Sequence, residues 1–465
     1  MTEDDRITGR SDRLLPTTRR ALLHRVAVAQ SEGRTPSLVA GVVRDGLLVW
    51  TGARSMVDGH APDPDVQYRI GSITKTFVAV LVLRLRDEGL LDLADPLGRH
   101  LPGTPADDVT VAQLLAHSGG LAAETPAPWW ERTDGALRPG LDDLLEQESP
   151  LKHPAGRLHH YSNPGYALLG ALVERLRGAS WGEVLRREVL VPLGMDRTTL
   201  LPEHPHAGGF AVHPWANVML PEPLTDTGRM GPAGQLWSTG ADLGRWAAFL
   251  AAGDDAVLSA DTLAEMRRPA VGPDDADWTS GYGLGLQLRR HEGRVLYGHT
   301  GSMPGFTAGL WVSAADGLAA FALSNATSGP STPQLAAELI GITAAHEPRL
   351  PEPWRPLTEV DEELLALTGP WYWGAAPNVL SLRADGVLEL AQLAGGRRGS
   401  RFRPCADGSW LGLDNYYTGE TLRVVRHPDG TVSHLDIGSF VYTREPYGPA
   451  GAVPGGVDPE GWRAF

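Results

Sequence analysis

Two of the 41 basic residues in this 465-residue chain are lysines, and one of them, Lys75, lies three positions after a serine, Ser72. Arginine stays protonated near neutral pH, whereas a buried lysine can lose its proton and act as a base. A serine hydroxyl becomes an effective nucleophile when an adjacent base takes its proton. Because residues three apart share one face of a helix, this pair could be a nucleophile and its base. The alternative is a helix-capping serine followed by an exposed lysine.

The other lysine, Lys152, also lies three positions after a serine, Ser149. Residues 153–156 follow it and include a proline and a glycine, which oppose a helix. Ser72, in contrast, begins a segment whose residues 77–85 are apolar on nearly all sides, as in a buried helix. We therefore expect Lys152 to lie at the surface and only the first pair to be held in contact.

Two later segments carry further groups that could act on a substrate. Tyr161 and Asn163 precede a predicted helix, where the phenol could relay protons and the amide could donate to a substrate carbonyl. Residues 299–302, His-Thr-Gly-Ser, stand at the end of a predicted strand. A glycine at a strand edge lets a substrate backbone approach closely.

These groups must be positioned by a fold that mixes helices and strands. The pattern of apolar residues and of Gly and Pro breaks predicts helices at 17–32, 72–88, 164–178, 180–190, 239–252, 259–267 and 333–346. It predicts a hairpin over 37–51 and strands near 281–288, 293–298, 305–313 and 317–324. With one hairpin early and the other strands late, both ends of this region are expected to pair in one sheet.

The chain divides by composition into four parts. Residues 1–346 form the helix-and-strand region, and 347–357, with four prolines, form a stiff linker. Repeated hairpin patterns over 358–447 predict a small antiparallel β-barrel or sandwich, and 448–465 form a tail rich in Gly and Pro. The predicted fold class is therefore α+β, an antiparallel sheet flanked by helices with a helical subdomain, followed by a small antiparallel, lipocalin-like barrel.

Charge and composition exclude several classes of function. The net charge of −15 opposes binding to nucleic acid and to anionic lipid surfaces. The single cysteine, Cys405, excludes an intrachain disulfide and a cysteine-rich metal site. His204 and His206 flank a proline in a loop and are not expected to bind a metal, and no cofactor is expected. The N-terminus lacks the apolar core of a secretory signal, and the longest apolar run, 77–83, is too short to span a bilayer, so a cytoplasmic location without membrane insertion is predicted.

Three motifs, taken together, resemble those of the serine β-lactamase and penicillin-binding-protein superfamily. In chain order they are Ser72-x-x-Lys75, Tyr161-x-Asn163 and His299-Thr300-Gly301. The spacing is similar to that of the branch that holds class C β-lactamases, carboxypeptidases and esterases. Residues 114–121, 192–195 and 234–239 fit the same family, so the resemblance covers about 10–346.

The resemblance implies a role for each motif residue. Ser72 would form an acyl-enzyme, Lys75 and Tyr161 would carry the proton to the leaving group, and Asn163 and His299 would position the substrate and the relay. The backbone N–H groups of Ser72 and Ser302 would form the oxyanion hole. Thr300 and Gly301 would contact the substrate.

The third motif departs from the pattern in which many members have lysine at the position of His299. The histidine form is similar to that of D-aminopeptidases, esterases and the penicillin-binding-protein-type thioesterases that release and cyclise nonribosomal peptides. A permanent cation for a carboxylate is then replaced by an imidazole that ordinarily titrates near neutral pH.

Other residues could contribute to substrate binding. Trp237 and the tryptophans at 129, 130 and 278 could line an apolar cleft or belong to the core. Arg444 could bind a peptide carboxylate through its forked guanidinium or form a surface ion pair. The histidines at 117, 159 and 160 are expected to be structural.

Three functions remain open from the sequence. The first is a thioesterase that takes a peptidyl group onto Ser72, from a carrier protein or another thioester, and releases it by macrocyclisation or hydrolysis. The second is a D-stereospecific peptidase, of the D-Ala-D-Ala carboxypeptidase or D-aminopeptidase type, or an esterase or β-lactamase-like hydrolase. The third is a non-catalytic sensor of peptides.

Overall fold

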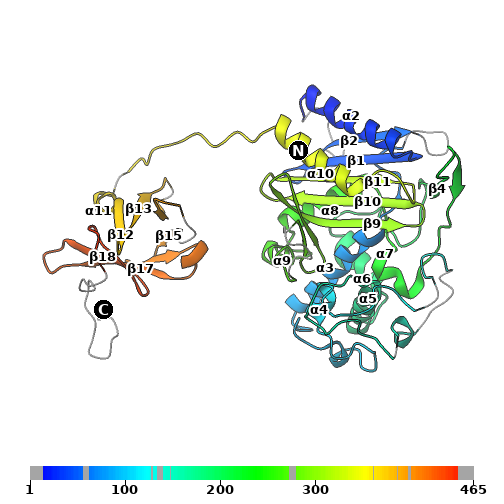
Figure 1. The fold of residues 1–465 in the computed structure, drawn as a ribbon, viewed down its shortest axis with the longest axis horizontal. Coiled ribbons are helices and arrows are strands. Elements are labelled where there is room, and N and C mark those ends of the chain that lie inside the picture. The colour runs from blue at the N-terminus through cyan, green and yellow to red at the C-terminus, as the bar shows by residue number, and fades with distance from the viewer. Residues whose placement is uncertain are drawn as a thin grey trace. The chain divides into compact units, whose positions relative to one another are not determined.

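The computed structural model describes residues 14–55, 62–126, 129–133, 140–146, 148–271, 279–359, 361–384, 386–395 and 399–448. The chain forms two compact units, Met1–Arg349 and Leu350–Phe465 (Figure 1). Each unit has its own hydrophobic core and its own main sheet.

The first unit is built on a seven-stranded antiparallel sheet with the order β2-β1-β11-β10-β9-β8-β7. Its strands are β1 (Ser37–Arg44), β2 (Leu47–Ser55), β7 (Ser280–Tyr282), β8 (Gln287–His291), β9 (Arg294–Met303), β10 (Phe306–Ser313) and β11 (Leu318–Ser324). The pairing of β1 with β11 joins the early hairpin to the late strands, as the sequence predicted.

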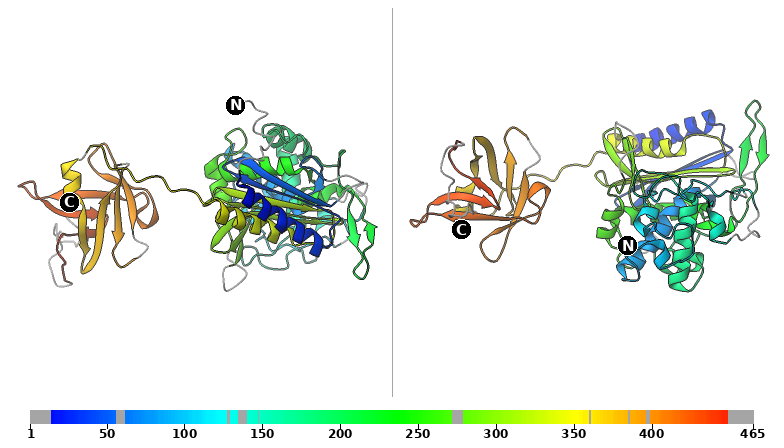
Figure 2. Two further views of the ribbon diagram at one scale, coloured as in Figure 1. Left: turned by 90° about the horizontal axis from the view of Figure 1, so that it is seen from above. Right: turned by 60° about the horizontal axis from the view of Figure 1, so that its bottom comes forward.

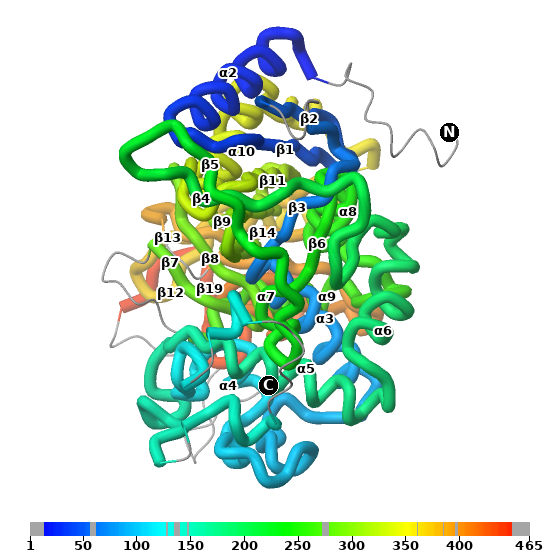
Figure 3. The backbone as a smooth tube through the Cα atoms, turned by 90° about the vertical axis from the view of Figure 1, so that its right-hand side faces the viewer, coloured from blue at the N-terminus to red at the C-terminus, as the bar shows by residue number. Residues whose placement is uncertain are grey.

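Helices cover both faces of this sheet. Leu38, Ala40 and Val42 of β1 face a core that they share with α2 and α10, while Val39 and Val43 face the larger core of the helical region. Figures 2 and 3 show α2 and α10 side by side on one face and α3 to α8 on the other. Both faces of β1 are therefore buried, which explains its nearly unbroken apolar sequence.

The helices of this unit lie close to their predicted positions, apart from two short ones, Val111–Leu115 and Gly231–Gly234, which were not predicted. They are α2 (Pro16–Glu32), α3 (Thr74–Asp87), α4 (Val111–Leu115), α5 (Asn163–Arg177), α6 (Trp181–Leu185), α7 (Gly231–Gly234), α8 (Gly240–Ala252), α9 (Ala260–Met266) and α10 (Thr332–His346). The short strands β3 (Tyr68–Arg69) and β6 (Trp237–Ser238) pair with each other, as do β4 (Phe210–Val212) and β5 (Met219–Pro221).

Three predicted elements differ in detail from the structure. The strand predicted at 281–288 is two strands, β7 and β8, because the chain turns between them at Gly285, where φ is +79°. The helix predicted at 180–190 is α6 followed by a wider, π-helical turn at Arg186–Leu190. The helix predicted to begin at residue 72 begins with a separate turn of 3-10 helix, Gly71–Ile73.

The second unit is a meander of eight antiparallel strands in chain order. They are β12 (Gly369–Trp373), β13 (Ala376–Leu382), β14 (Leu388–Gln392), β15 (Ser400–Pro404), β16 (Trp410–Gly412), β17 (Thr421–Arg426), β18 (Val432–Ile437) and β19 (Phe440–Tyr442), preceded by α11 (Glu362–Leu367). Two backbone hydrogen bonds between Tyr372 and Thr443 bring the first and last strands together. The result is a nearly closed barrel, and the predicted fold class is confirmed.

Candidate active site

Ser72 stands in the 3-10 turn that leads into α3. Gly71 before it has φ +53°, a left-handed conformation that glycine adopts without strain. A Cβ atom on Gly71 would lie 2.6 Å from the backbone nitrogen of Ser302. The turn therefore lies directly against β9 at Ser302, the residue whose backbone N–H the resemblance assigns to the oxyanion hole.

Lys75 is fully buried in the first turn of α3. Its Nζ atom donates to three acceptors: Ser72 Oγ at 3.0 Å, Asn163 Oδ1 at 2.7 Å and the carbonyl oxygen of Ala233 in α7 at 2.6 Å. Burial lowers the pKa of Lys75 to about 7, although the charges of Glu124 and Glu131 act in the opposite direction. Above neutral pH the amine is therefore uncharged and able to take the proton of Ser72.

Tyr161 lies on the other side of this pair. Its ring centroid is 4.9 Å from Lys75 Nζ, and its hydroxyl shares a hydrogen bond with Ser72. Burial raises the pKa of Tyr161 above its usual range, and the hydrogen bond with Ser72 opposes this only in part. The phenol therefore keeps its proton at neutral pH, which suits a relay from the amine to a leaving group better than a phenolate base.

Asn163 is the first residue of α5, whose N-cap is Ser162. Its amide links Lys75 to Glu124: Oδ1 accepts from Lys75, and Nδ2 donates to Glu124 Oε1 at 2.6 Å. The indole of Trp130 donates to the other oxygen of Glu124 at 2.8 Å. The orientation of the Asn163 amide is thus fixed by its two neighbours.

His299 is fully buried in β9, beside these groups. Its Nδ1 is 2.6 Å from the carbonyl oxygen of Thr300, which can only accept, so Nδ1 carries the proton. Its Nε2 then accepts from the hydroxyl of Tyr282 at 2.9 Å. Burial, and secondarily the charge of Lys75, lowers the pKa of His299 to about 3.

The imidazole of His299 is therefore a neutral part of the site. The sequence predicted a group that titrates near neutral pH, and this is wrong because the side chain is enclosed and both ring nitrogens are already bonded. A neutral imidazole supplies no charge for a substrate carboxylate. Its neighbours form a buried aromatic cluster: Tyr161, Tyr282, Tyr166 and His117.

The glycine of the third motif is needed by the protein itself. A Cβ atom on Gly301 would lie 2.0 Å from the carbonyl oxygen of Ile70, so its absence lets the turn before Ser72 pack on β9. The predicted reason, close approach of a substrate backbone, is not required to explain this residue. Thr300 is partly exposed, and its backbone nitrogen donates to Gln287.

Two predicted substrate contacts make structural contacts within their own units. Trp237 is 1% exposed and packs edge-on against Phe306, so it belongs to the core and does not line an open cleft. Arg444 belongs to the barrel unit, where its guanidinium covers the ring of Trp371 at 4.0 Å. It donates to the carbonyl oxygens of Ala366, Thr368 and Pro370, so its role is to tie α11 and β12 together rather than to form a surface ion pair.

The tryptophans of the Pro-rich loop have different environments. Trp129 is 63% exposed, whereas Trp130 is 8% exposed and bonded to Glu124. Trp278 lies outside the described residues. Glu124 and Tyr282, which touch Asn163 and His299, were missed by the sequence analysis. Glu124 lies three residues after the segment 114–121 that fits the family, and this proximity was the one sequence signal that could have identified it.

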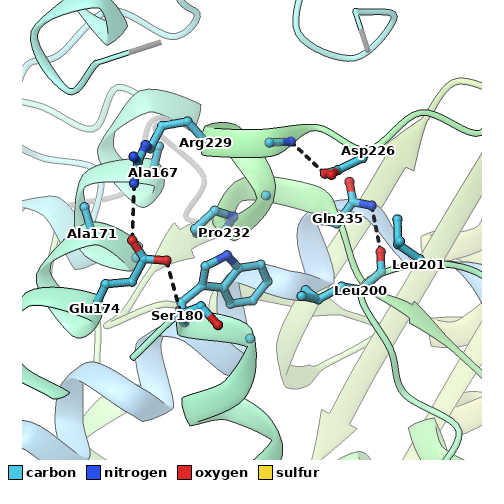
Figure 4. Close-up of a pocket in the computed structure, with 15 residues that line it drawn as sticks. Ala167, Ala171, Glu174, Ser180, Leu200, Leu201, Asp226, Arg229, Pro232 and Gln235 are labelled. Carbon is cyan, nitrogen blue, oxygen red and sulfur yellow. Dashed lines mark hydrogen bonds and ion pairs between the residues drawn. The ribbon is translucent and has the colours of Figure 1, made fainter. Parts of the chain in front are cut away.

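A separate cavity of about 410 Å³ is lined by residues of α5, α6 and α7 (Figure 4). Gly231, Pro232 and Gln235 line it from α7 and the residue after that helix, while Ala233 of the same helix accepts from Lys75. Glu174 and Arg229 form an ion pair at 3.2 Å on its wall. None of the predicted catalytic residues lines this cavity. Within the described residues, no cluster of His, Cys, Asp and Glu could hold a metal ion.

Comparison with known proteins identifies the family. The model of the family described as Beta-lactamase matches residues 19–345. The chain belongs to the β-lactamase and penicillin-binding-protein superfamily. This confirms the resemblance drawn from the three motifs. A second model, Domain of unknown function (DUF7586), matches residues 360–444, within the barrel unit.

Individual relatives agree with this assignment. Penicillin-binding protein 4 of Amycolatopsis lactamdurans is 30% identical over 357 residues, which are 71% of this chain and 91% of that protein. A D-stereospecific amidohydrolase from Streptomyces sp. is 25% identical, with a TM-score of 0.57 over 71% of this chain and 98% of that one. The octameric penicillin-binding protein homologue from Pyrococcus abyssi has a TM-score of 0.62 at 22% identity and covers 91% of this chain and 99% of that one.

The arrangement as a whole is that of a serine acyl-transfer site. The hydroxyl of Ser72, the buried amine of Lys75 and the phenol of Tyr161 lie in contact with one another, and the turn that holds Ser72 packs on β9. In a site of this kind, a serine next to a base can form an ester with an acyl group, which then passes to water or to another nucleophile. Among the described residues, no helix is both long and apolar enough to cross a membrane.

Proposed function

We propose that this protein is an acyl-enzyme hydrolase of D-amino acid amides, short D-peptides or the corresponding esters. The observation that carries the proposal is the contact of Ser72 with a buried Lys75 whose pKa is about 7. A base with a pKa near the working pH gives the most effective proton transfer. The sensor hypothesis is disfavoured because an acylation-competent base is present.

The state of His299 supports this choice among the family's activities. Substrates that end in a carboxylate, such as D-Ala-D-Ala peptides and β-lactams, benefit from a fixed cation. His299 is neutral, and the charged groups that act on the pKa of Lys75 are the two anions Glu124 and Glu131. An amide or ester without that carboxylate fits the site better. Similarity to a D-stereospecific amidohydrolase supports the D configuration.

Release of a peptidyl thioester by cyclisation or hydrolysis, the first expectation from the sequence, is the second candidate. It is supported by the same acyl-enzyme chemistry, because a thioester is a better acyl donor than an amide and an internal amine can replace water. The two candidates differ in the acyl donor and in the group that accepts the acyl group, but they use the same residues of the protein. A carrier protein as partner belongs to this candidate alone.

The test compares donors on one preparation. The purified chain would be given D- and L-phenylalanine amide, the matching methyl esters, and an N-acetylcysteamine thioester of a peptide with a free N-terminal amine. We expect hydrolysis of D-configured amides and esters, loss of activity in Ser72→Ala, and no cyclic product. A cyclic product from the thioester, with D-amides left intact, would establish the second candidate. Hydrolysis of L- and D-amides at equal rates would contradict D specificity.

A further inference from the structure

His117 follows α4 and lies against the segment that carries Tyr161. It is 2% exposed. Its carbonyl oxygen accepts from the backbone nitrogen of His160 at 2.7 Å, and its ring nitrogen Nδ1 accepts from the backbone nitrogen of Ser162 at 3.0 Å. One buried residue therefore holds the backbone N–H group on each side of Tyr161.

The ring of His117 also packs on the ring of Tyr161. The two ring centroids are 4.1 Å apart, and the ring planes are inclined by 32°. The phenol hydroxyl at the far end of the Tyr161 ring shares a hydrogen bond with Ser72. Because a tyrosine side chain turns about only two bonds, contacts to its flanking backbone and to its ring together fix the place of the hydroxyl.

The backbone conformation of His117 would suit a residue without a side chain. Its φ is +54°, in the left-handed region, which glycine adopts without strain and other residues adopt at a cost in energy. Such strain persists where surrounding contacts hold it, and it is concentrated at functional sites. The hydrogen bond from Ser162 and the packing on Tyr161 are made by the side chain that a glycine would lack.

His117 is neutral and makes no hydrogen bond to the reacting groups. Since Nδ1 accepts from a backbone N–H, the proton of the neutral ring is on Nε2. Burial, and secondarily the charge of Lys75, lowers the pKa of His117 well below its usual range. Within the described residues, no hydrogen bond joins His117 to Ser72 or to Lys75. An effect of this residue on the reaction is therefore expected through the segment that it holds.

The start of α5, which carries Asn163, is anchored by other contacts. Ser162 Oγ donates to the carbonyl oxygen of Ala122 at 2.7 Å, and the backbone nitrogen of Asn163 donates to the carbonyl oxygen of Ala123 at 2.9 Å. Loss of the His117 ring should therefore leave Asn163 in place and act mainly on Tyr161.

We propose that His117 is a positioning residue for Tyr161, and that it holds the phenol where its proton can reach the leaving group. The inference rests on the proposed function, because it assigns a role within that acylation step. Lys75 takes the hydroxyl proton of Ser72, and the serine oxygen bonds to the acyl carbon. The bond from that carbon to the leaving nitrogen or oxygen then breaks as Tyr161 donates its proton to the leaving atom, and the ammonium of Lys75 returns a proton to the phenolate.

A merely structural role for His117 makes a different prediction. An amide nitrogen must be protonated in order to leave, whereas p-nitrophenolate leaves without a proton. A misplaced phenol should therefore slow acylation by amides far more than acylation by p-nitrophenyl esters. A general loosening of the site would slow acylation by both donors alike.

The decisive experiment compares two donors with the same acyl group, D-phenylalanine amide and D-phenylalanine p-nitrophenyl ester. We would measure kcat/KM, because it reports acylation for both donors. One variant is His117→Gly, which loses the ring but suits the left-handed backbone, and the other is His117→Asn, which keeps an acceptor for the N–H of Ser162. The control is His24→Asn, at an exposed position of α2.

We expect His117→Gly to lower kcat/KM by about 100-fold for the amide and by less than about fivefold for the ester. His117→Asn should show the same selective loss on the amide to a smaller extent, and His24→Asn should behave as the wild type. Should His117→Gly fail to fold, as judged by circular dichroism, His117→Asn carries the comparison. Equal losses on the two donors in a folded variant would overturn the inference.

A second measurement tests the coupling between the two residues. In a Tyr161→Phe background, the further change His117→Gly should alter kcat/KM for the amide by less than about threefold, because the ring that it positions no longer has a proton to donate. A further loss as large as the one in the wild-type background would contradict the inference.

Failure of the proposed function can be told apart from failure of this inference. If the wild type leaves both D-phenylalanine donors intact, the proposed function fails. The comparison is then made with ethyl acetate and p-nitrophenyl acetate, since ethoxide needs a proton to leave and p-nitrophenolate does not. A loss confined to ethyl acetate in His117→Gly supports the inference. Equal losses on both acetates, or a wild type that does not hydrolyse ethyl acetate, contradict it.

Discussion

The pairs Ser72–Lys75 and Ser149–Lys152 have the same spacing in the sequence and different surroundings in the structure. Lys75 is fully buried, with three acceptors around its amine. Lys152 is 37% exposed in its side chain and pairs with Glu146 at 2.7 Å, and Ser149 is exposed. The first pair lies on a 3-10 turn and the first turn of a helix, whereas the second lies in a loop. Burial and helical geometry, rather than the spacing alone, distinguish the serine and lysine that could act as a nucleophile and its base.

The largest difference in activity is expected when the hydroxyls of Ser72 and Ser149 are removed in turn. Ser72→Ala should lower kcat/KM for p-nitrophenyl acetate by about 10⁴-fold or more, because no other group forms the acyl-enzyme. Ser149→Ala should stay within about twofold of the wild type, as expected for an exposed residue outside the site. Intact-mass spectrometry after labelling with a fluorophosphonate would show the adduct in Ser149→Ala and none in Ser72→Ala. An adduct on both variants would show that the nucleophile is a different residue.

A second prediction replaces each lysine by arginine. Lys75→Arg should lower kcat/KM by about 10³-fold, because a guanidinium does not give up its proton at working pH and general base catalysis is lost. Lys152→Arg keeps its exposed ion pair and should have no measurable effect. Steady-state kinetics with p-nitrophenyl acetate measure both variants, and circular dichroism checks that Lys75→Arg is folded. Substantial activity in a folded Lys75→Arg would exclude Lys75 as the base.

A third prediction concerns pH. Because the pKa of Lys75 is about 7, kcat/KM should fall about tenfold for each pH unit below that value and level off above it. A donor that does not itself titrate, p-nitrophenyl acetate, is required for this measurement. Lys152→Arg should give a superimposable profile. If kcat/KM instead begins to fall below about pH 10, Lys75 keeps the pKa of an exposed lysine.

The smallest expected effect is on stability. Since burial lowers the pKa of Lys75, the unfolded state binds more protons than the folded state between about pH 7 and 10, so this group makes the protein more stable as pH rises. Between pH 6.5 and 9.5, the unfolding free energy of the wild type should rise by about 3 kcal/mol more than that of Lys75→Met. Urea unfolding of the two proteins, with Lys152→Met as the control, measures this. A difference that does not vary with pH would contradict the lowered pKa.

The sequence predicted the fold and the groups around Ser72 well because these depend on local patterns. Periodicity predicted the helices apart from the short α4, α7 and α11, and turn residues predicted hairpins in both units. The breakers after Lys152 and the apolar helix after Ser72 were enough to separate the two lysines.

The properties that come from tertiary contacts could not be predicted in this way. The neutral state of His299 depends on Tyr282, which reaches it from β7, and on complete enclosure. The burial of Trp237 depends on its packing against Phe306. The charge near Asn163 depends on Glu124, 39 residues earlier in the chain. No local pattern contains these contacts, because each joins residues that are distant in sequence.

The close packing of Gly71 and Gly301 has a consequence for how this enzyme could be altered. Backbone contacts between the turn that holds Ser72 and β9 set the distance between these two segments, and no side chain of the loop that holds Glu124 and Trp130 takes part in those contacts. Variation in that loop can therefore change which molecules are accepted while the reaction itself is preserved. A directed-evolution library should leave both glycines untouched and concentrate its diversity at residues 124 and 129–131.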